Sequence, residues 1–582
     1  MRPPARGIQL PRGSPRSPKL RLSTSPCGRQ FSYKHPRHFL VAHQGSPRPQ
    51  LPFLYPSGPH FSHGQLLRLF SINATQKKFI KETARLSVRY SIVIFLFTTF
   101  ASIAGFGFLS EQQERAFPSP HEWSLITRLR FRRGKWWQVP ENNEEEGFPN
   151  WARVYSELQY ALNRLEHPNK DGAGVVEQDE GGVQMPGVGK PGLDVSQKSA
   201  EWRQGYFEVL MGMAAAAERL DGWVTDKWRR NVWAPEFVPS ASNARPKAVL
   251  PGMPELPDEE HRTAAAEAPE TFYLKIITTQ GFTTQQRLSA ALGYADWLNF
   301  KKLPDSAEEM YRWALDIAIA GLPSSESSAV IDQDTGVLSA TAPKELITPN
   351  IVYAATNLAI FLAEQRRLNS ALPIFVSVLR ARLGVDETDR PPYLPKKDDF
   401  SVMGTLLTLL AEPDYPPVPP SGDDPLLRDP TSRCEEAALK NYIGEILFAT
   451  AGSSSAQRQQ GLSWVRDGVS TAKLAQALPL IKENVDLRKK CEQCEEVGLE
   501  SWGKIMTYLA AEARDDKDAA AHAGGLSGLL WKLRGTKQLD ERVEELEGEE
   551  QGVVLRLNKL RSRMLKEDYE DMDRKYARTF VF

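Results

Sequence analysis

Residues 294–314 of the chain read YADWLNFKKLPDSAEEMYRWA, and residues 358–378 read LAIFLAEQRRLNSALPIFVSV. Both stretches space their apolar and small residues in the same way, as two runs separated by a short polar stretch. The matching positions are Tyr294, Ala295, Leu298, Ala307, Tyr311 and Ala314 in the first stretch, and Leu358, Ala359, Leu362, Ala371, Phe375 and Val378 in the second. Spacings of three and four residues place side chains on one face of a helix, so each stretch predicts a helix, a turn and a second helix.

The shared pattern matches the 34-residue helix-turn-helix template of the tetratricopeptide repeat. In that template, Ala295 and Ala359 let the first helix approach its partner closely, while Tyr311 and Phe375 fill the groove to the next repeat. The alternative is an irregular helical bundle. Because the same six-position pattern occurs twice, the sequence favours the repeat architecture over this alternative. One repeat cannot bury both of its faces, so at least three should stack. We therefore expect an all-α fold, with a tetratricopeptide-type helical-repeat solenoid over residues 150–534.

Weaker helical patterns surround the two stretches. Further helices are expected over residues 150–166, 200–233, 433–451, 458–478, 489–514 and 517–534. Glycine or proline enrichment predicts loops at residues 168–198, 235–270 and 413–431. The C-terminal segment, residues 535–582, spaces apolar residues near every seventh position among many charges, which indicates a capping helix or, alternatively, an oligomerising coiled coil.

The N-terminal region separates sharply from the rest in charge. The chain of 582 residues has 73 basic and 73 acidic residues, but its first 90 residues contain 16 basic residues and one acidic residue, Glu82. Residues 1–70 are rich in arginine, serine and proline and contain no acidic residue, which is typical of a cleavable mitochondrial targeting sequence. The alternative is a basic tail that binds nucleic acid or acidic lipid. We favour targeting and expect no nucleic-acid partner.

One uncharged stretch predicts a membrane span. Residues 90–110 read YSIVIFLFTTFASIAGFGFLS, and about 20 apolar residues suffice to cross a hydrocarbon core as a helix. A basic juxtamembrane segment, residues 71–89, precedes the stretch, whereas Glu111 and Glu114 follow it. Because positive flanks stay inside, the N-terminus should lie in the matrix and the acidic body in the intermembrane space. Residues 111–149, rich in aromatic and basic side chains, should form an interfacial segment in contact with membrane lipid.

The sequence contains no pattern typical of a catalytic, cofactor or metal site. Cys491 and Cys494 form a CxxC, but they lie inside a helical run and no second ligand pair accompanies them. Four cysteines are too few for a disulfide scaffold, so stability is expected to come from packing. Residues 187–191 only vaguely resemble a phosphate-binding loop, because Pro191 stands where serine or threonine is needed. We therefore expect a binding protein and not an enzyme.

A stacked helical-repeat solenoid presents a concave surface that holds an extended peptide or a helix. On the repeat template, the residues that face this groove are Asp296, Asn299, Tyr353, Thr356 and Asn357. The alternative is that these polar side chains only solvate an outer face. Recognition of a C-terminal carboxylate by paired lysines and asparagines is not expected, because Asn357 has no lysine partners in the pattern.

The targeting-like tail, the single span and the repeat residues together resemble the tetratricopeptide-repeat adaptor subunit of the fungal mitochondrial inner-membrane i-AAA protease supercomplex. The resemblance implies a non-catalytic protein that binds unfolded or membrane proteins in the intermembrane space and delivers them to that protease. The alternative is a mitochondrial import receptor or a complex-assembly scaffold. Protease treatment separates these, because the body of the adaptor should be degraded only after the outer membrane is opened.

Overall fold

A computed structural model describes residues 73–142, 148–178, 192–229, 231–241, 243–249, 251–323, 330–387, 415–452, 454–522 and 526–579. The targeting sequence expected at residues 1–70 lies outside the described residues. The chain divides into two compact units, Met1–Thr98 and Thr99–Phe582.

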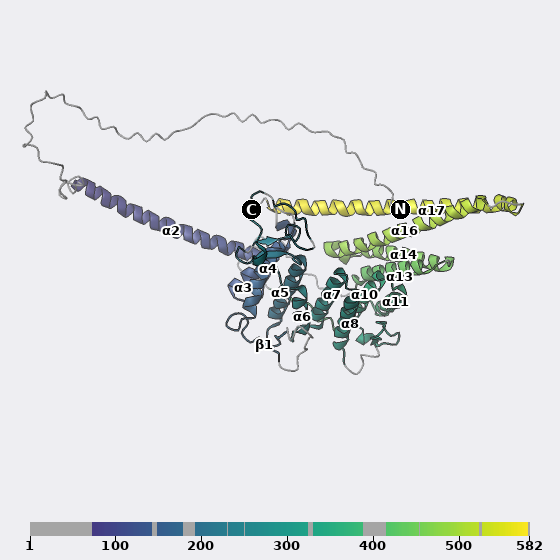
Figure 1. The fold of residues 1–582 in the computed structure, drawn as a ribbon, viewed down its shortest axis with the longest axis horizontal. Coiled ribbons are helices and arrows are strands. Elements are labelled where there is room, and N and C mark those ends of the chain that lie inside the picture. The colour runs from purple at the N-terminus through teal and green to yellow at the C-terminus, as the bar shows by residue number, and fades with distance from the viewer. Residues whose placement is uncertain are drawn as a thin grey trace, which may run out of the picture. The chain divides into compact units, whose positions relative to one another are not determined.

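Helix α2 (Ala74–Ala116) contains the expected span (Figure 1). Its 43 residues correspond to about 64 Å of helix at about 1.5 Å per residue, so the helix is longer than the span expected at 90–110. The reason is that no proline interrupts residues 74–117. Phe95, Phe97 and Phe100 are each more than two-thirds exposed. Within the described part of the chain, α2 is the one helix long and apolar enough to cross a membrane.

The second unit is mostly helical, and its helices pack on one another in chain order (Figure 1). The α-helices are α3 (Leu125–Gln138), α4 (Trp151–Leu165), α5 (Ala200–Arg219), α6 (Pro269–Thr278), α7 (Thr284–Phe300), α8 (Pro304–Ala320), α10 (Pro349–Glu364), α11 (Leu368–Leu383), α13 (Ser432–Thr450), α14 (Ser455–Gln476), α15 (Pro479–Glu483), α16 (Val485–His522) and α17 (Leu526–Thr579). Short 3-10 helices are η1 (Pro140–Asn142), η2 (Glu259–His261) and η3 (Lys344–Leu346). A continuous core cluster extends from α3 to α13, and a second cluster joins α14, α16 and α17.

The two stretches that share the repeat pattern form helix pairs with the same turn. The pairs are α7 with α8 and α10 with α11, and their alanine, leucine and aromatic pattern residues are buried apart from half-buried Tyr294. Lys302 and Arg366 occupy equivalent turn positions with φ of 62° and 60°. In both turns the next amide donates to the carbonyl five residues earlier, Leu303 to Leu298 at 3.0 Å and Arg367 to Leu362 at 2.9 Å. Equal side-chain spacing has thus produced equal local structure.

Small sheets correct the all-α expectation. Helix α5 ends at Arg219, well before the end of the helix expected over 200–233, because Gly222 adopts a left-handed φ of 75°. Strand β3 (Val224–Asp226) then pairs antiparallel with β4 (Val232–Trp233) and with β5 (Arg262–Ala264) in the order β4-β3-β5. Two more strands, β1 (Val176–Glu177) and β2 (Leu193–Asp194), pair across the expected glycine-rich loop. Residues 179–191 of that loop lie outside the described residues.

The C-terminal helices form one long antiparallel hairpin. Helix α16 continues through Arg514 and Lys517, where the sequence pattern predicts a break, because no glycine or proline interrupts residues 504–522. Helix α17 packs along α16 through Val543, Val553 and Leu560. Ion pairs follow the antiparallel register, and those at its two ends are Arg488–Glu567 at 2.7 Å and Lys517–Asp540 at 2.6 Å. The heptad-like residues of α17, such as Val543, Val553 and Leu560, are therefore covered by α16 and α14 of the same chain.

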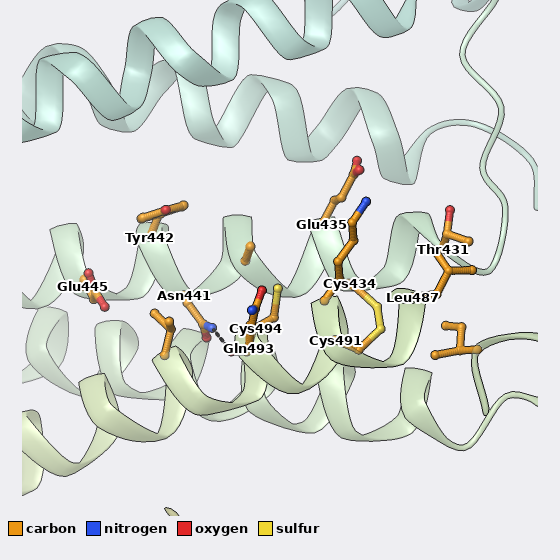
Figure 2. Close-up of a pocket in the computed structure, with 14 residues that line it drawn as sticks. Thr431, Cys434, Glu435, Asn441, Tyr442, Glu445, Leu487, Cys491, Gln493 and Cys494 are labelled. Carbon is orange, nitrogen blue, oxygen red and sulfur yellow. Dashed lines mark hydrogen bonds between the residues drawn. A yellow bond between two sulfur atoms is a disulfide. The ribbon is translucent and has the colours of Figure 1, made fainter. Parts of the chain in front are cut away.

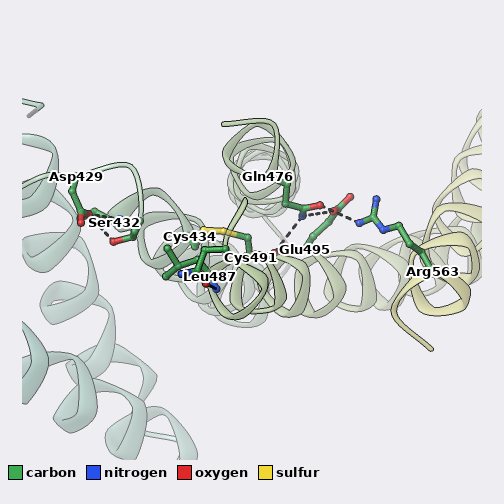
Figure 3. Close-up of a disulfide and its surroundings, with 10 residues drawn as sticks. Asp429, Ser432, Cys434, Gln476, Leu487, Cys491, Glu495 and Arg563 are labelled. Carbon is green, nitrogen blue, oxygen red and sulfur yellow. Dashed lines mark hydrogen bonds between the residues drawn. A yellow bond between two sulfur atoms is a disulfide. The ribbon is translucent and has the colours of Figure 1, made fainter. Parts of the chain in front are cut away.

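A disulfide joins α13 to α16, which the sequence reading did not foresee (Figure 3). Cys434 and Cys491 are separated by 57 positions, and both are buried. Packing is therefore not the sole source of stability, because a covalent link closes a long loop. Cys494, the other half of the CxxC, is a free thiol, and burial raises its pKa to about 11. At neutral pH this thiol is protonated and a weak nucleophile.

A buried charge cluster fixes the C-terminal end of α2 to α3. Glu114 is 4% exposed, and its carboxylate contacts the guanidinium groups of Arg132 at 2.9 Å and Arg128 at 3.2 Å. The amide and hydroxyl of Ser119 donate to the same carboxylate at 2.8 and 2.7 Å. Arg132 also donates to the carbonyl of Ser110 at 2.7 Å. The last two turns of α2, which contain Ser110 and Glu114, are thus bonded to α3.

Candidate functional site

The first helices of successive pairs present one face each to a common groove. A cavity of about 650 Å³ is lined by residues of α7, α10, α11 and α13 and of the segment that precedes α13. These residues are Gln285, Ser289, Pro349, Asn350, Tyr353, Thr356, Ile360, Arg382, Leu426, Leu427, Asp429, Thr431, Ser432, Glu435, Ala438, Leu439 and Tyr442. Four separate helices therefore contribute to a single surface.

Helical periodicity explains why these side chains meet. Helix α10 begins at Pro349 after the N-cap Thr348, whose hydroxyl accepts from the amide of Ile351. From this start, Tyr353, Thr356 and Ile360 follow at intervals of three and four and so share one face of the helix. Glu435, Ala438 and Tyr442 follow the same spacing along α13. The groove forms because these faces of α10 and α13 line the same cavity.

A second cavity continues the groove from α13 to α16 (Figure 2). Its volume is about 420 Å³. It shares Thr431, Glu435, Ala438 and Tyr442 of α13 with the first cavity, and its other lining residues are Cys434, Asn441, Glu445, Ile481, Leu487, Lys490, Cys491, Gln493, Cys494 and Val497. We call the two cavities together the inner groove. The disulfide lies in its wall and so fixes the distance between α13 and α16.

The inner groove combines apolar walls with a few charged groups. Tyr442 stacks on Phe375 of α11 with ring centroids 5.2 Å apart, and burial raises the pKa of its phenol, which is therefore neutral at physiological pH. Arg382 pairs with Glu435 at 2.5 Å across the junction of α11 and α13. The Nε of Arg382 is buried and has no hydrogen-bond partner among the described residues. A ligand in the groove would therefore meet apolar surface together with polar and charged side chains, among them Glu435, Asn441 and Lys490.

Two of the residues expected to face a peptide groove, Tyr353 and Thr356, line the first cavity. Tyr353 lies on its wall and is 52% exposed, so its ring is available to a ligand. Thr356 also lines the wall, although its hydroxyl donates to the carbonyl of Val352 at 2.6 Å. Asn357 lies on the same helix but does not line either cavity, and its amide donates to the carbonyl of Tyr353 at 2.8 Å. The structure therefore brings together only part of the expected set.

The two expected residues of α7 join helices to one another. Asn299 donates to Glu364 at the end of α10 at 3.0 Å and accepts from Gln365 at 3.3 Å. Asp296 accepts a hydrogen bond from the buried hydroxyl of Tyr311 on α8. Burial raises the pKa of Asp296, and the nearby charge of Glu364 raises it further. Neither side chain lines either of these cavities. Asp296 joins the two helices of one pair, α7 and α8, whereas Asn299 joins α7 to the end of α10 in the next pair.

The sequence reading missed the contribution of α13 and of the segment before it. Glu435, Ala438 and Tyr442 repeat at helical spacing, and this signal is present in the sequence. Leu426 and Leu427 carry no comparable signal, because they belong to a proline-rich segment with no regular secondary structure. Their place in the groove depends on how the chain returns to α13 after residues 388–414, which lie outside the described residues.

Neither a metal cluster nor a known relative defines the site. Among the described residues, no group of three or more His, Cys, Asp or Glu side chains is placed to hold a metal ion. Comparison with known proteins found no matching family model, no matching curated protein and no matching solved structure. Function is therefore inferred from the geometry and chemistry of the inner groove.

Proposed function

We propose that the protein is a membrane-anchored, non-catalytic adaptor that binds unfolded or membrane polypeptides and delivers them to the i-AAA protease of the mitochondrial inner membrane. Its N-terminus would lie in the matrix, α2 would be its single span, and a tetratricopeptide-type body would lie in the intermembrane space. The observation that carries the proposal is the inner groove, which runs over α7, α10, α13 and α16 and is lined by apolar and aromatic side chains with polar and charged ones between them.

The groove suits an extended polypeptide better than a small molecule. Its two adjacent cavities share residues of α13, so one elongated ligand can contact both. Apolar side chains such as Ile360, Leu439 and Val497 would bind the apolar side chains that an unfolded protein exposes, with about 25 cal/mol gained per Å² of apolar surface buried.

The membrane anchor is supported by the surface of α2. Large apolar side chains are exposed around the helix, among them Ile94, Phe97 and Ile103, each at least 60% exposed. In water such a surface would be costly, whereas in a bilayer it is the surface that lipid tails contact. The basic residues before the span and Glu111 and Glu114 after it support an orientation with the body outside the matrix.

Affinity purification from detergent-solubilised mitochondria tests the delivery partner. The tagged full-length chain should recover a AAA protease of the inner membrane together with membrane-protein fragments, whereas an unrelated tagged single-span protein should recover neither. Recovery of protein-import subunits without a AAA protease would favour the import-receptor alternative and contradict the adaptor proposal.

A further inference from the structure

A proline-rich segment of the same chain lies against α5, α7 and α10. We call residues 415–427, YPPVPPSGDDPLL, the strap. The strap has no regular secondary structure and begins beside α5, where burial and the charges of Glu208 and Glu201 raise the pKa of Tyr415. Pro419 then lies with Gln204 of α5 and Gln286 of α7 around a cavity of about 110 Å³. The strap therefore passes from α5 towards α10 and α13 on the side of the inner groove.

Main-chain hydrogen bonds hold the middle of the strap. The carbonyl of Ser421 accepts from the backbone amide of Gln285 on α7 at 3.1 Å and from the side-chain amide of Asn350 on α10 at 2.9 Å. The backbone amide of Asn350 donates to the carbonyl of Gly422 at 3.4 Å. The amide of Leu426 donates to the carbonyl of Ile347 at 2.7 Å. Two successive peptide units are thus recognised through their backbones, as in the binding of an extended peptide.

Asn350 is the centre of this seat. Its side chain is 3% exposed, and besides the Ser421 carbonyl it donates to the carboxylate of Asp423 at 2.9 Å. Gly422 adopts a left-handed φ of 75°, and a Cβ at this position would collide with the Asn350 side chain. A buried asparagine therefore selects an acidic side chain and a residue without a side chain immediately before it.

The seat and the inner groove belong to one surface. Leu426, 7% exposed, and Leu427 form part of the groove wall, and Gln285 and Ser289 line both the groove and the small cavity beside Pro419. The strap thus lies against α5, α7 and the start of α10, and its last two residues form part of the wall over α10 and α13.

We propose that the strap is an intramolecular ligand, and that its seat on Gln285 and Asn350 is a binding site for extended peptides of the same chemistry. Such peptides carry prolines, then a glycine, an acidic residue and a leucine. A peptide that uses the whole surface must displace the strap, so the strap lowers the apparent affinity by competing in cis. This inference deepens the proposed function and rests on it.

The test is the affinity of the full-length detergent-solubilised protein for a fluorescent peptide with the sequence of residues 415–427, measured by anisotropy. Gly422→Val places a side chain against Asn350 when the strap is docked, so it weakens docking of the strap but changes no residue of the seat. We therefore expect the peptide to bind this variant at least tenfold more tightly than the wild type. Gly452→Val is the matched control, because Gly452 also has a left-handed φ, 52°, but its Cβ would meet no neighbour. This control should bind the peptide as the wild type does.

Two further variants keep the outcome decisive. Replacing residues 415–420 by glycine and serine removes the proline contacts without touching Gly422 and should also increase peptide binding. Adding Asn350→Ala to Gly422→Val should abolish the gain. Unchanged peptide affinity in both strap variants, with wild-type helicity by circular dichroism, would overturn the inference.

An unfolded, carboxymethylated polypeptide serves as a second probe that separates this inference from the proposed function. If the wild type binds this probe and the strap variants bind neither probe more tightly, the adaptor proposal survives and the strap inference fails. If the strap variants gain affinity for the strap peptide but no form of the protein binds the unfolded probe, the strap inference survives and the adaptor proposal fails.

Discussion

Replacing Glu114 by alanine is expected to lower the free energy of unfolding of the helical body by about 3–5 kcal/mol, which is the usual cost of breaking a buried ion pair from one side. The substitution leaves the guanidinium of Arg132, whose side chain is 2% exposed, without its closest carboxylate at 2.9 Å. It also removes the acceptor of the Ser119 amide and hydroxyl. Urea unfolding in detergent, followed by circular dichroism, measures the change.

Glu111→Ala is the matched control for this prediction. Glu111 lies one turn earlier on α2 and pairs with Arg115 at 2.9 Å, but both side chains are about one-third exposed. Solvent screening makes such a pair worth about 0–1 kcal/mol, so the control should stay close to the wild type. Equal losses in the two variants would show that the burial of Glu114 does not matter for stability.

Replacing Cys434 by serine should produce the second large effect, a loss of about 4 kcal/mol. The disulfide to Cys491 closes a loop of 57 positions, and the chain-entropy model assigns about that stabilisation to a loop of this length. Treating the wild type with a reductant should lower its midpoint of urea unfolding about as much as the Cys434→Ser substitution does.

Cys494→Ser is the control for the disulfide. Cys494 lies one turn from Cys491 in the same cavity wall but forms no disulfide, so its substitution should change the midpoint little. The midpoint of Cys434→Ser should no longer respond to the reductant. Continued sensitivity of that variant to the reductant would contradict the pairing of Cys434 with Cys491.

Local spacing allowed much of the helical body to be predicted. The pairs built around Ala295 and Ala359 are present because small residues at helical spacing determine both the helix and its closest contact. The break after Arg219 was not predicted, because Val224 fits a helical period as well as a strand and only the left-handed turn at Gly222 decides between them. The strands β1 to β5 were not predicted either, because each has only two or three residues. That is too short to show the alternation of apolar and polar residues typical of a strand.

Long-range contacts explain what the sequence reading missed at the site. The disulfide between Cys434 and Cys491 depends on how α13 and α16 pack, and sequence alone cannot supply that pairing. Asn350 resembles any polar residue at a helix start until the return of the strap places the Ser421 carbonyl beside it. The predicted groove residues were chosen from the template of one helix pair. Such a template does not distinguish a position that contacts the next pair, as Asn299 does, from a position that is open to the groove.

Site-specific photo-crosslinking to an unfolded polypeptide tests most directly whether the inner groove binds polypeptides. A photoreactive phenylalanine would replace Tyr353, which is 52% exposed in the groove, or Tyr569 of α17, which is 66% exposed and lines neither cavity. We predict crosslinks from position 353 that excess unlabelled unfolded polypeptide suppresses, and few crosslinks from position 569. Equal crosslinking from the two positions, or none from position 353 while the polypeptide still binds, would contradict the proposed role of the groove.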